Sequence, residues 1–196
     1  MTAPDDEPPD PYYAYKPSLV GAACEFTLRS DGLHWQIGAR NGRVRYERIR
    51  AVRLSYRPVT MQSRRFVTEI WSTDNPKMQI VSVSWRSVLE QTRQDSDYAA
   101  FVAELHRRLA AVGSTAKFTT GLPVPTYWLG VAVFASVLVT MAVLIVRALM
   151  LAQWGAAGVV GVIFLIFAYQ IGNYFRLNRP ERYRPDAIPP AILPKG

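Results

Sequence analysis

The residues with the clearest chemical potential are arginines gathered in one stretch of the chain. Between Arg40 and Arg65 there are nine arginines and one acid, Glu47, so these 26 residues carry a charge of +8, equal to the net charge of the whole 196-residue chain. Guanidinium groups bind carboxylates and phosphates through paired hydrogen bonds. The pattern therefore favours recognition of an anionic surface, with six contact candidates: Arg43, Arg45, Arg53, Arg57, Arg64 and Arg65.

Residues with catalytic potential are few. His34 alternates away from its apolar neighbours, we expect His106 near the polar side of a helix, and neither histidine has a metal-ligand spacing. There is no nucleophile elbow, phosphate-cradling glycine loop or paired-carboxylate motif. The single Cys24 excludes a disulfide scaffold and is expected to be a small buried hydrophobe. The sequence predicts a noncatalytic protein with no cofactor, no metal site and no small-molecule substrate.

Two long apolar segments are expected to anchor the rest of the chain. Residues 129–146 and 155–171 contain no charge, and each is flanked by Trp or Tyr, as expected at a membrane interface. We predict two transmembrane helices, 126–147 and 154–175, forming an antiparallel hairpin within 126–175. Small residues recur at four-residue spacing, and we favour contact within the hairpin over docking on another membrane protein as their role. They are Ala132, Ser136, Thr140, Ala157 and Gly161.

The flanking charges predict the orientation of the hairpin. Basic residues precede the first segment and follow the second, whereas the turn between the segments holds only Arg147. The positive-inside rule then places both termini in the cytoplasm and the chain in the inner membrane. The N-terminus, MTAPDDEPPDP, is acidic and Pro-rich, unlike a signal peptide, which agrees with a cytoplasmic N-terminal half.

Ahead of the hairpin, the pattern is that of a small β-rich domain at residues 18–113. Residues 1–17 are acidic and Pro-rich and predict a disordered arm. Alternating apolar residues then predict six strands, with one hairpin turn at Ser30-Asp31-Gly32 and a second within Gly38-Ala39-Arg40-Asn41-Gly42, where Asn-Gly favours the positive φ angles of a tight turn. The strands are expected at 24–28, 33–37, 43–46, 52–56, 66–71 and 78–85, with Trp35, Trp71 and Trp85 in the core.

An amphipathic helix closes the domain and defines its class. One helical face is apolar, Asp95 or Ser96 is placed to cap the helix, and Gly113 to end it. The residues of that face are Tyr98, Phe101, Val102, Leu105, Leu109 and Val112. Residues 86–94 suggest one further short helix. Antiparallel strands followed by a covering helix predict an α+β fold. A linker at 114–125 and a basic, Pro-rich cytoplasmic tail at 176–196 complete the organisation.

The order of elements resembles the bacterial membrane-associated proteins that carry a pleckstrin-homology-like (PH-like) domain. The resemblance covers roughly residues 20–112 and rests on Tyr46-Glu47-Arg48-Ile49-Arg50-Ala51-Val52, similar to that group's short turn between strands, and on the helix ending Leu105-His106-Arg107-Arg108-Leu109. It implies a PH-like fold beside a membrane hairpin. Lipid-binding members of the wider superfamily use basic residues around a long first hairpin loop, whereas this chain has the tight, acidic Ser30-Asp31-Gly32.

The expected partners follow from the basic stretch and the membrane hairpin. We expect a scaffold or accessory subunit that contacts anionic lipids of the inner leaflet, another membrane protein, or both. Apolar Val59 and Met61 lie beside the basic residues and suit contact with a membrane. The alternatives are a lipid-binding sensor, a component of an enzyme or transporter whose active groups lie on a partner, and arginines that simply form the solvent face of a sheet. No specific nucleic acid is expected, because a small core would claim the tryptophans. The tail would either dock on a neighbour through Ile188, Ile192 and Leu193 or remain frayed.

Overall fold

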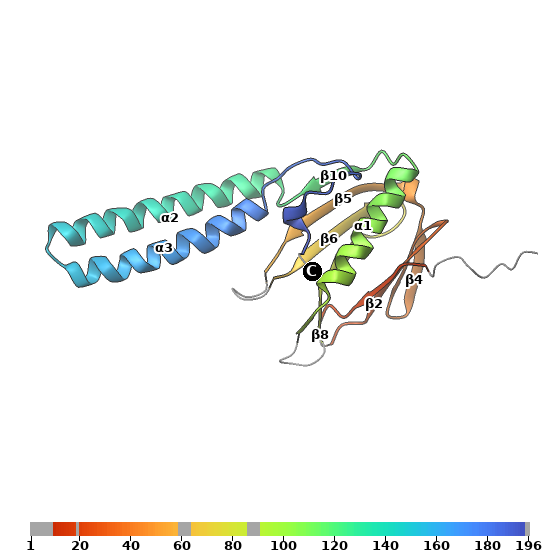
Figure 1. Ribbon diagram of the computed structural model, residues 1–196, viewed down its shortest axis with the longest axis horizontal. Coiled ribbons are helices and arrows are strands. Elements are labelled where there is room, and N and C mark those ends of the chain that lie inside the picture. The colour runs from red at the N-terminus through yellow and green to blue at the C-terminus, as the bar shows by residue number, and fades with distance from the viewer. Residues whose placement is uncertain (1–9, 19, 59–63, 86–90, 195–196) are drawn as a thin grey trace, which may run out of the picture. The chain divides into compact units, whose positions relative to one another are not determined.

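A computed structural model describes residues 10–18, 20–58, 64–85 and 91–194. The chain forms two compact units, one from the residues up to 119 together with those from 182 onward, and the other from residues 120–181. The first unit mixes antiparallel sheets with a helix, and the second is a pair of long helices (Figure 1). The α+β class predicted from the sequence is therefore confirmed.

The first sheet of the β-rich unit has the strand order β1-β2-β3-β4. Its strands are β1 (Tyr12–Tyr15), β2 (Cys24–Arg29), β3 (Gly32–Ile37) and β4 (Arg40–Val44). The second sheet has the order β10-β5-β6-β7, and a separate hairpin pairs β8 with β9. Their bounds are β5 (Ile49–Tyr56), β6 (Phe66–Ser72), β7 (Met78–Val81), β8 (Val83–Trp85), β9 (Gln91–Arg93) and β10 (Lys117–Thr120).

Helix α1 (Asp95–Ala111) closes the core of this unit. It crosses the sheet that holds β5 and β6 (Figure 1), where the hydroxyls of Tyr98 and Thr68 lie 2.7 Å apart in a buried hydrogen bond. The predicted apolar face is buried except for Val112, which follows the helix and is 41% exposed, and Gly113, with a φ of +62°, comes after the end of the helix as expected. Cys24 is buried in the same core, as predicted.

The N-terminal arm was predicted to be disordered, and this is wrong for Tyr12–Tyr15. These residues form β1, which pairs antiparallel with β2, and Tyr13 and Tyr15 are buried. Their hydroxyls donate hydrogen bonds to the backbone oxygens of Val81 and Gln79 on β7. Buried tyrosines supply apolar area and a satisfied polar end, which outweighs the Pro-rich composition around them. Residues 1–9 lie outside the described residues.

The second hairpin turn uses the first two residues of the predicted segment 38–42 and not its Asn-Gly pair. Gly38 and Ala39 form it, with a φ of +60° at Gly38, and Asn41-Gly42 lies inside β4. Gly42 is opposite Trp35, and a Cβ on Gly42 would meet the indole ring at 2.7 Å. This glycine therefore makes room for a side chain, and Asn-Gly does not mark the turn.

Two other predicted segments are strands. The predicted helix at 86–94 is wrong where it is described, since Gln91–Arg93 form β9, and residues 86–90 lie outside the described residues. The predicted linker at 114–125 contains β10, and the expected strand at 78–85 is broken at Ser82 into β7 and β8. The Ser82 hydroxyl accepts a 3.0 Å hydrogen bond from the backbone N–H of Phe66, which accounts for its burial at the break.

The C-terminal tail completes the core of the β-rich unit. Thr119 and Arg182 form an antiparallel bridge, and Tyr183 packs against Phe118 and His106 with ring centroids 5.8 and 5.7 Å apart. Farther along, the short 3-10 helix η2 (Pro190–Ile192) buries Ile192. The expectation of a frayed tail is thus wrong for its described residues, and Ile188, Ile192 and Leu193 contact the chain's own core.

The second unit consists of α2 (Val124–Met150) and α3 (Trp154–Leu177). Both are long and apolar enough to cross a membrane, with mean hydropathies of 2.7 and 1.9 over 18 residues. In α2 none of that window is buried, and in α3 only 6% is buried. The outer faces of the two helices are therefore apolar and uncovered, which is unfavourable in water.

The α2–α3 contact uses large side chains, contrary to the prediction of a small-residue interface. Phe134 packs on Phe167 and Phe175, with ring centroids 5.7 and 5.6 Å apart. Ala132, Ser136 and Thr140 are exposed on the outside of the pair, and a Cβ on Gly161 would meet nothing within 4 Å, although Ala157 is buried. The Ser136 and Thr140 hydroxyls each donate to the carbonyl oxygen four residues earlier, so these donors are satisfied within their own helix.

Candidate functional site

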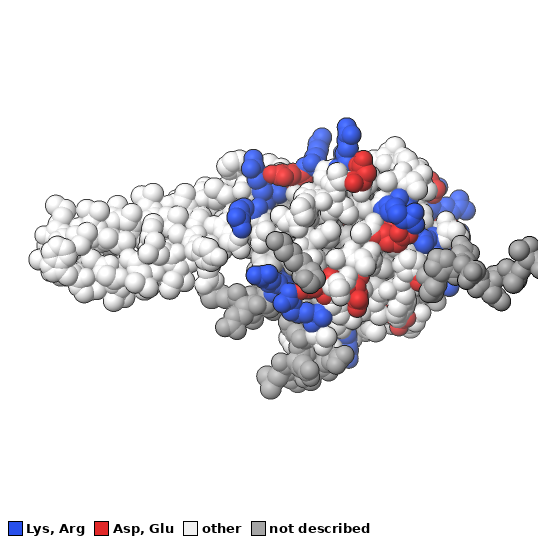
Figure 2. All heavy atoms as spheres, viewed as in Figure 1, with Lys and Arg blue, Asp and Glu red and all other residues white. Residues whose placement is uncertain are grey.

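The six predicted contact arginines are divided between the two sheets. Arg43 lies on β4, and Arg45 follows it as an exposed residue before the 3-10 turn η1 (Tyr46–Arg48). Arg53 lies on β5 and Arg57 just after it, while Arg64 and Arg65 precede β6. On the face shown in Figure 2, basic and acidic side chains lie next to each other over the β-rich unit, and most of the helical hairpin is uncharged. Three of the six arginines belong to two separate charged clusters, Arg43 with Asp31, and Arg53 and Arg57 with Glu69.

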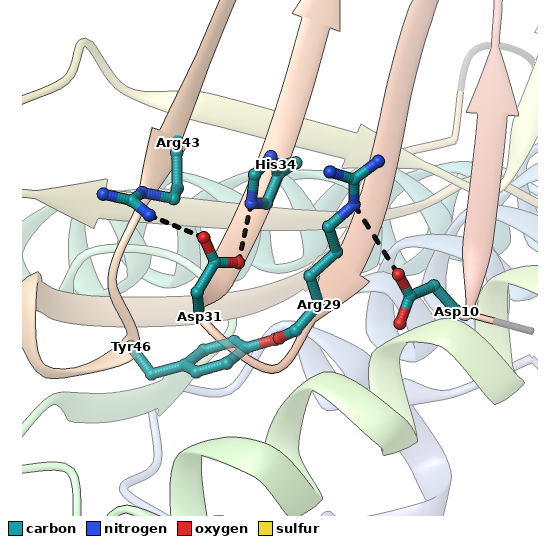
Figure 3. Close-up of polar contacts among 6 residues, drawn as sticks. All are labelled: Asp10, Arg29, Asp31, His34, Arg43 and Tyr46. Carbon is teal, nitrogen blue, oxygen red and sulfur yellow. Dashed lines mark hydrogen bonds and ion pairs between the residues drawn. The ribbon is translucent and has the colours of Figure 1, made fainter. Parts of the chain in front are cut away.

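The first group, the Asp31 cluster, consists of Asp31, His34 and Arg43 (Figure 3). Asp31, in the β2–β3 turn, accepts a 2.6 Å hydrogen bond from Nη1 of Arg43 and lies 2.8 Å from Nε2 of His34. The hydrogen bond from Arg43, followed by that from His34, lowers the pKa of Asp31 to about 2. Arg43 is thus neutralised by an internal acid, and its side chain braces the β2–β3 turn.

A cleft of about 610 Å³ adjoins the Asp31 cluster. Asp10 and Arg29, paired at 3.6 Å in Figure 3, form part of its wall, and α1 contributes Arg107 and Arg108. Both of these arginines bond to Glu104, with hydrogen bonds of 2.6 and 2.8 Å. Each cation described in this cleft therefore has a carboxylate partner, so the cleft presents little unneutralised charge.

The second group, the Glu69 cluster, surrounds a buried carboxylate on β6 and consists of Glu69, Arg53, Arg57 and Lys77. Glu69 is 1% exposed, yet it accepts hydrogen bonds from Nη2 of Arg57 at 2.9 Å and from Nε2 of Gln79 at 3.1 Å. Lys77 Nζ lies 2.5 Å from the carboxylate, and Arg53 Nη1 lies 4.0 Å away. A buried carboxylate requires this kind of compensation.

Strand register explains why these groups converge. Arg53 and Gln79 lie directly opposite Glu69 on the two neighbouring strands. Residues opposite each other in an antiparallel sheet project side chains from the same face. Burial raises the pKa of Glu69, but the hydrogen bond from Lys77 and the charge of Arg57 outweigh burial and lower the pKa overall. Glu69 is therefore ionised at neutral pH and holds three cations in fixed positions.

Trp71 belongs to this outer face and not to the core. Its ring lies 5.1 Å from the Arg53 guanidinium and 5.2 Å from the Lys77 ammonium. Cations over an indole ring are attracted by its negative face. The prediction of core positions is wrong for Trp71 and Trp85, which are half-buried outside the core, whereas Trp35, also half-buried, packs against the core as expected.

Neither cluster has the arrangement of a catalytic centre. Glu69 and Asp31 are held ionised by cations, so neither is poised to exchange a proton near neutral pH. His106, expected on the polar side of α1, is instead fully buried. Burial raises the pKa of the Cys24 thiol, which makes it unreactive. In the part of the chain that the structure describes, no three His, Cys, Asp or Glu residues are grouped to hold a metal ion.

Sequence reasoning missed Glu69, Lys77 and Asp31 as organisers of the arginines. The role of Glu69 could have been recognised from its place in the middle of the apolar run Phe66–Trp71. A carboxylate is stable at a central strand position only when cations or hydrogen-bond donors surround it. The predicted apolar contacts Val59 and Met61 lie outside the described residues. Comparisons with protein-family models, curated proteins and solved structures find no match to this chain.

Proposed function

We propose that this chain is a noncatalytic inner-membrane protein that holds a PH-like domain at the cytoplasmic face, where it acts as a scaffold or accessory subunit of a membrane complex. The observation that carries the proposal is the pair of uncovered apolar helices, α2 and α3, inserted within the sequence of the β-rich unit. An exterior this apolar is stable in hydrocarbon and not in water. The helices therefore act as an anchor.

The charges beside the anchor support the cytoplasmic orientation. Lys117 precedes α2, and Arg176, Arg179, Arg182 and Arg184 lie at or beyond the end of α3, whereas the far end of the hairpin has only Arg147, in the last turn of α2. Cytoplasmic flanks carry the excess of basic residues in membrane proteins. With this orientation, the β-rich unit and the tail both face the cytoplasm.

Strand order supports a PH-like arrangement for the β-rich unit. Strands β2, β3 and β4 belong to one sheet, β5, β6 and β7 to a second, and α1 follows them and packs on the shared core. This is the order that the resemblance leads us to expect. A domain of this kind offers surfaces for binding, and the charged clusters described above position side chains for contact and not for proton transfer.

To test the accessory role, the full chain is extracted into native nanodiscs, and the mass and the protein composition of the extracted particle are measured. A stoichiometric complex with another membrane protein is the expected result. If that complex has enzymatic or transport activity that is lost without this chain, the active groups lie on the partner. A particle that holds only this chain and lipid would contradict the accessory role.

The second candidate function is binding of anionic lipid, favoured by the excess of cations around Glu69. Each basic residue near an anionic leaflet contributes about 1 kcal/mol, and this contribution falls as salt rises. The full chain in nanodiscs that contain phosphatidylglycerol should enrich this lipid around itself at low salt. Equal lipid composition around the protein and in the bulk nanodisc would argue against this function.

A further inference from the structure

The outer face of the second sheet has more positive charge than its own acid can neutralise. Arg53, Arg57 and Lys77 share the single carboxylate of Glu69. Arg65 adds a fourth cation beside Arg57, so four positive charges stand against one negative charge. Most ion-pair clusters in proteins are closer to balance, because unneutralised like charges repel each other when water is partly excluded.

Arg57 and Arg65 face each other across the hairpin between β5 and β6. The backbone N–H of Arg57 donates a 2.8 Å hydrogen bond to the carbonyl oxygen of Arg65, directly beyond the Tyr56–Phe66 pair. Side chains directly opposite have Cβ atoms about 5 Å apart, and like charges there are destabilising. Burial, followed by the charge of Arg57, lowers the pKa of Arg65.

Arg65 has a buried donor without a partner. Among the described residues its guanidinium forms no ion pair, and its Nε atom is buried without a hydrogen-bond acceptor. Arg57 differs, because Glu69 fixes its Nη2 atom. One guanidinium is thus held in place by a carboxylate, and the opposite one, whose described electrostatic neighbours are Arg57 and Tyr15, has an Nε–H without an acceptor in the described part of the chain.

A buried hydroxyl lies on the same face between Arg53 and Arg57. Ser55 is directly opposite Val67 and is 1% exposed, and its Oγ atom has no hydrogen-bond partner among the described residues. Arg57 must extend past this row to reach Glu69, because Glu69 is opposite Arg53. An unsatisfied buried hydroxyl costs about 1 to 3 kcal/mol unless something bonds to it. Ser55 is thus a further donor without an acceptor beside the two arginines.

We propose that Arg57 and Arg65 bind a phosphate group on the outer face of this sheet, with Ser55 as an additional donor. Phosphate fits better than a carboxylate because it offers up to two negative charges and three or more acceptor oxygens to a site with surplus charge. The site itself is independent of the proposed function, but its ligand rests on it: beside a membrane, the phosphate belongs to a lipid headgroup. A soluble phosphate ester is the other source of the same chemistry.

The test uses adjacent arginines as a matched pair. Arg65→Gln removes a guanidinium of the site, and Arg64→Gln removes an exposed neighbour with the same change in net charge. The full chain is placed in nanodiscs of phosphatidylcholine, and its thermal unfolding is followed during titration with inorganic phosphate at constant ionic strength. Saturable stabilisation is expected for the wild type and Arg64→Gln, with the apparent Kd at least tenfold higher for Arg65→Gln.

A lipid arm identifies the source of the phosphate. The same three proteins are extracted from nanodiscs that contain phosphatidic acid or phosphatidylglycerol, and the lipids retained on each are counted by native mass spectrometry. Loss of phosphatidic acid in Arg65→Gln but not in Arg64→Gln supports the site with a lipid headgroup as ligand. Saturable phosphate binding without selective lipid loss supports the site with a soluble phosphate ester. An Arg57→Gln variant repeats both arms, with far-UV circular dichroism as the check that it folds.

The proposal is overturned if phosphate gives no saturable stabilisation and the two variants lose anionic lipid equally, since the arginines would then act only as diffuse charge. That result leaves the accessory role standing, because the mass of the native particle tests that role separately. Conversely, a particle without a protein partner would contradict the accessory role and leave the phosphate site intact.

Discussion

Acidification from pH 7 to pH 5 is expected to destabilise the β-rich unit through His106. This side chain is fully buried, with Nδ1 2.7 Å from the carbonyl oxygen of Val102 and Nε2 2.8 Å from the hydroxyl of Tyr183. A carbonyl oxygen can only accept a hydrogen bond, so the proton of the neutral ring lies on Nδ1. Nε2 then accepts a hydrogen bond from the hydroxyl of Tyr183. Burial lowers the pKa of His106 to about 4, although the hydrogen bond to Val102 opposes this.

The magnitude follows from the difference between the folded and unfolded states. The pKa of an unfolded histidine is about 6.5, so between pH 6.5 and pH 4 the unfolded chain binds a proton that the folded chain does not. The free energy of unfolding therefore falls as the pH falls through this window. A difference of about 2.5 pKa units corresponds to roughly 3 kcal/mol in full, of which about 2 kcal/mol is lost between pH 7 and pH 5.

The assay is urea unfolding of the full chain in detergent at pH 7, 6 and 5, followed by tryptophan fluorescence. A His106→Gln variant should have lower stability at pH 7 and little further loss at pH 5. Carboxylates whose pKa is lowered in the fold, such as Glu69, lose their contribution only below about pH 4.5. Equal slopes in wild type and His106→Gln would refute this reasoning.

Three further changes test other parts of the structure. Glu69→Gln should reduce the free energy of unfolding by about 1 to 3 kcal/mol in urea titrations, because it leaves three partly exposed cations without their carboxylate. Gly121→Ala should destabilise the helical unit, because the φ of Gly121 is +71° and a Cβ there would lie 2.1 Å from a backbone oxygen. Gly158→Ala is the control and should leave the melting temperature unchanged, because a Cβ on Gly158 would meet nothing within 4 Å. Thermal melting followed by circular dichroism compares the two variants. Ile192→Ala should cost about 2 to 4 kcal/mol by urea unfolding and expose β5, which η2 contacts, to faster amide hydrogen exchange, with the exposed neighbour changed in Ala191→Ser as the control.

The sequence predicted the elements whose signals are local. Ser30-Asp31-Gly32 defined a hairpin turn because a tight turn needs the glycine, which has a φ of +144°. The spacing of Tyr98, Phe101, Val102, Leu105 and Leu109 predicted the buried face of α1. The α2 and α3 segments were evident from length and hydropathy.

The wrong predictions concern residues whose surroundings are formed by segments far away in the sequence. His106 lies four residues after Val102 and three before Leu109, so it borders the apolar face of α1. It is buried when other parts of the chain cover a broader part of the helix than this apolar face alone. What widens that face is Phe118 and Tyr183, and Tyr183 is 77 residues farther along the chain. No local pattern reveals such a contact.

The candidate site shows the same division between local and distant signals. Arginine was the right residue type, and Arg53 and Arg57 were correctly placed on one strand face. The register between β5, β6 and β7 then selected their partners, Glu69 and Gln79, and a register depends on the whole sheet. The local sequence could not show that Arg43 would be neutralised by Asp31 in another turn.

The position of the two helices within the β-rich unit also sets an order of biosynthesis. Phe118 precedes α2, whereas Tyr183 and Ile192 follow α3, and all three contribute to one core. Because a chain is made from its N-terminus onward, both apolar helices are synthesised before the last core residues. The core of the β-rich unit therefore stays incomplete until both helices have been made, and the tail closes it last.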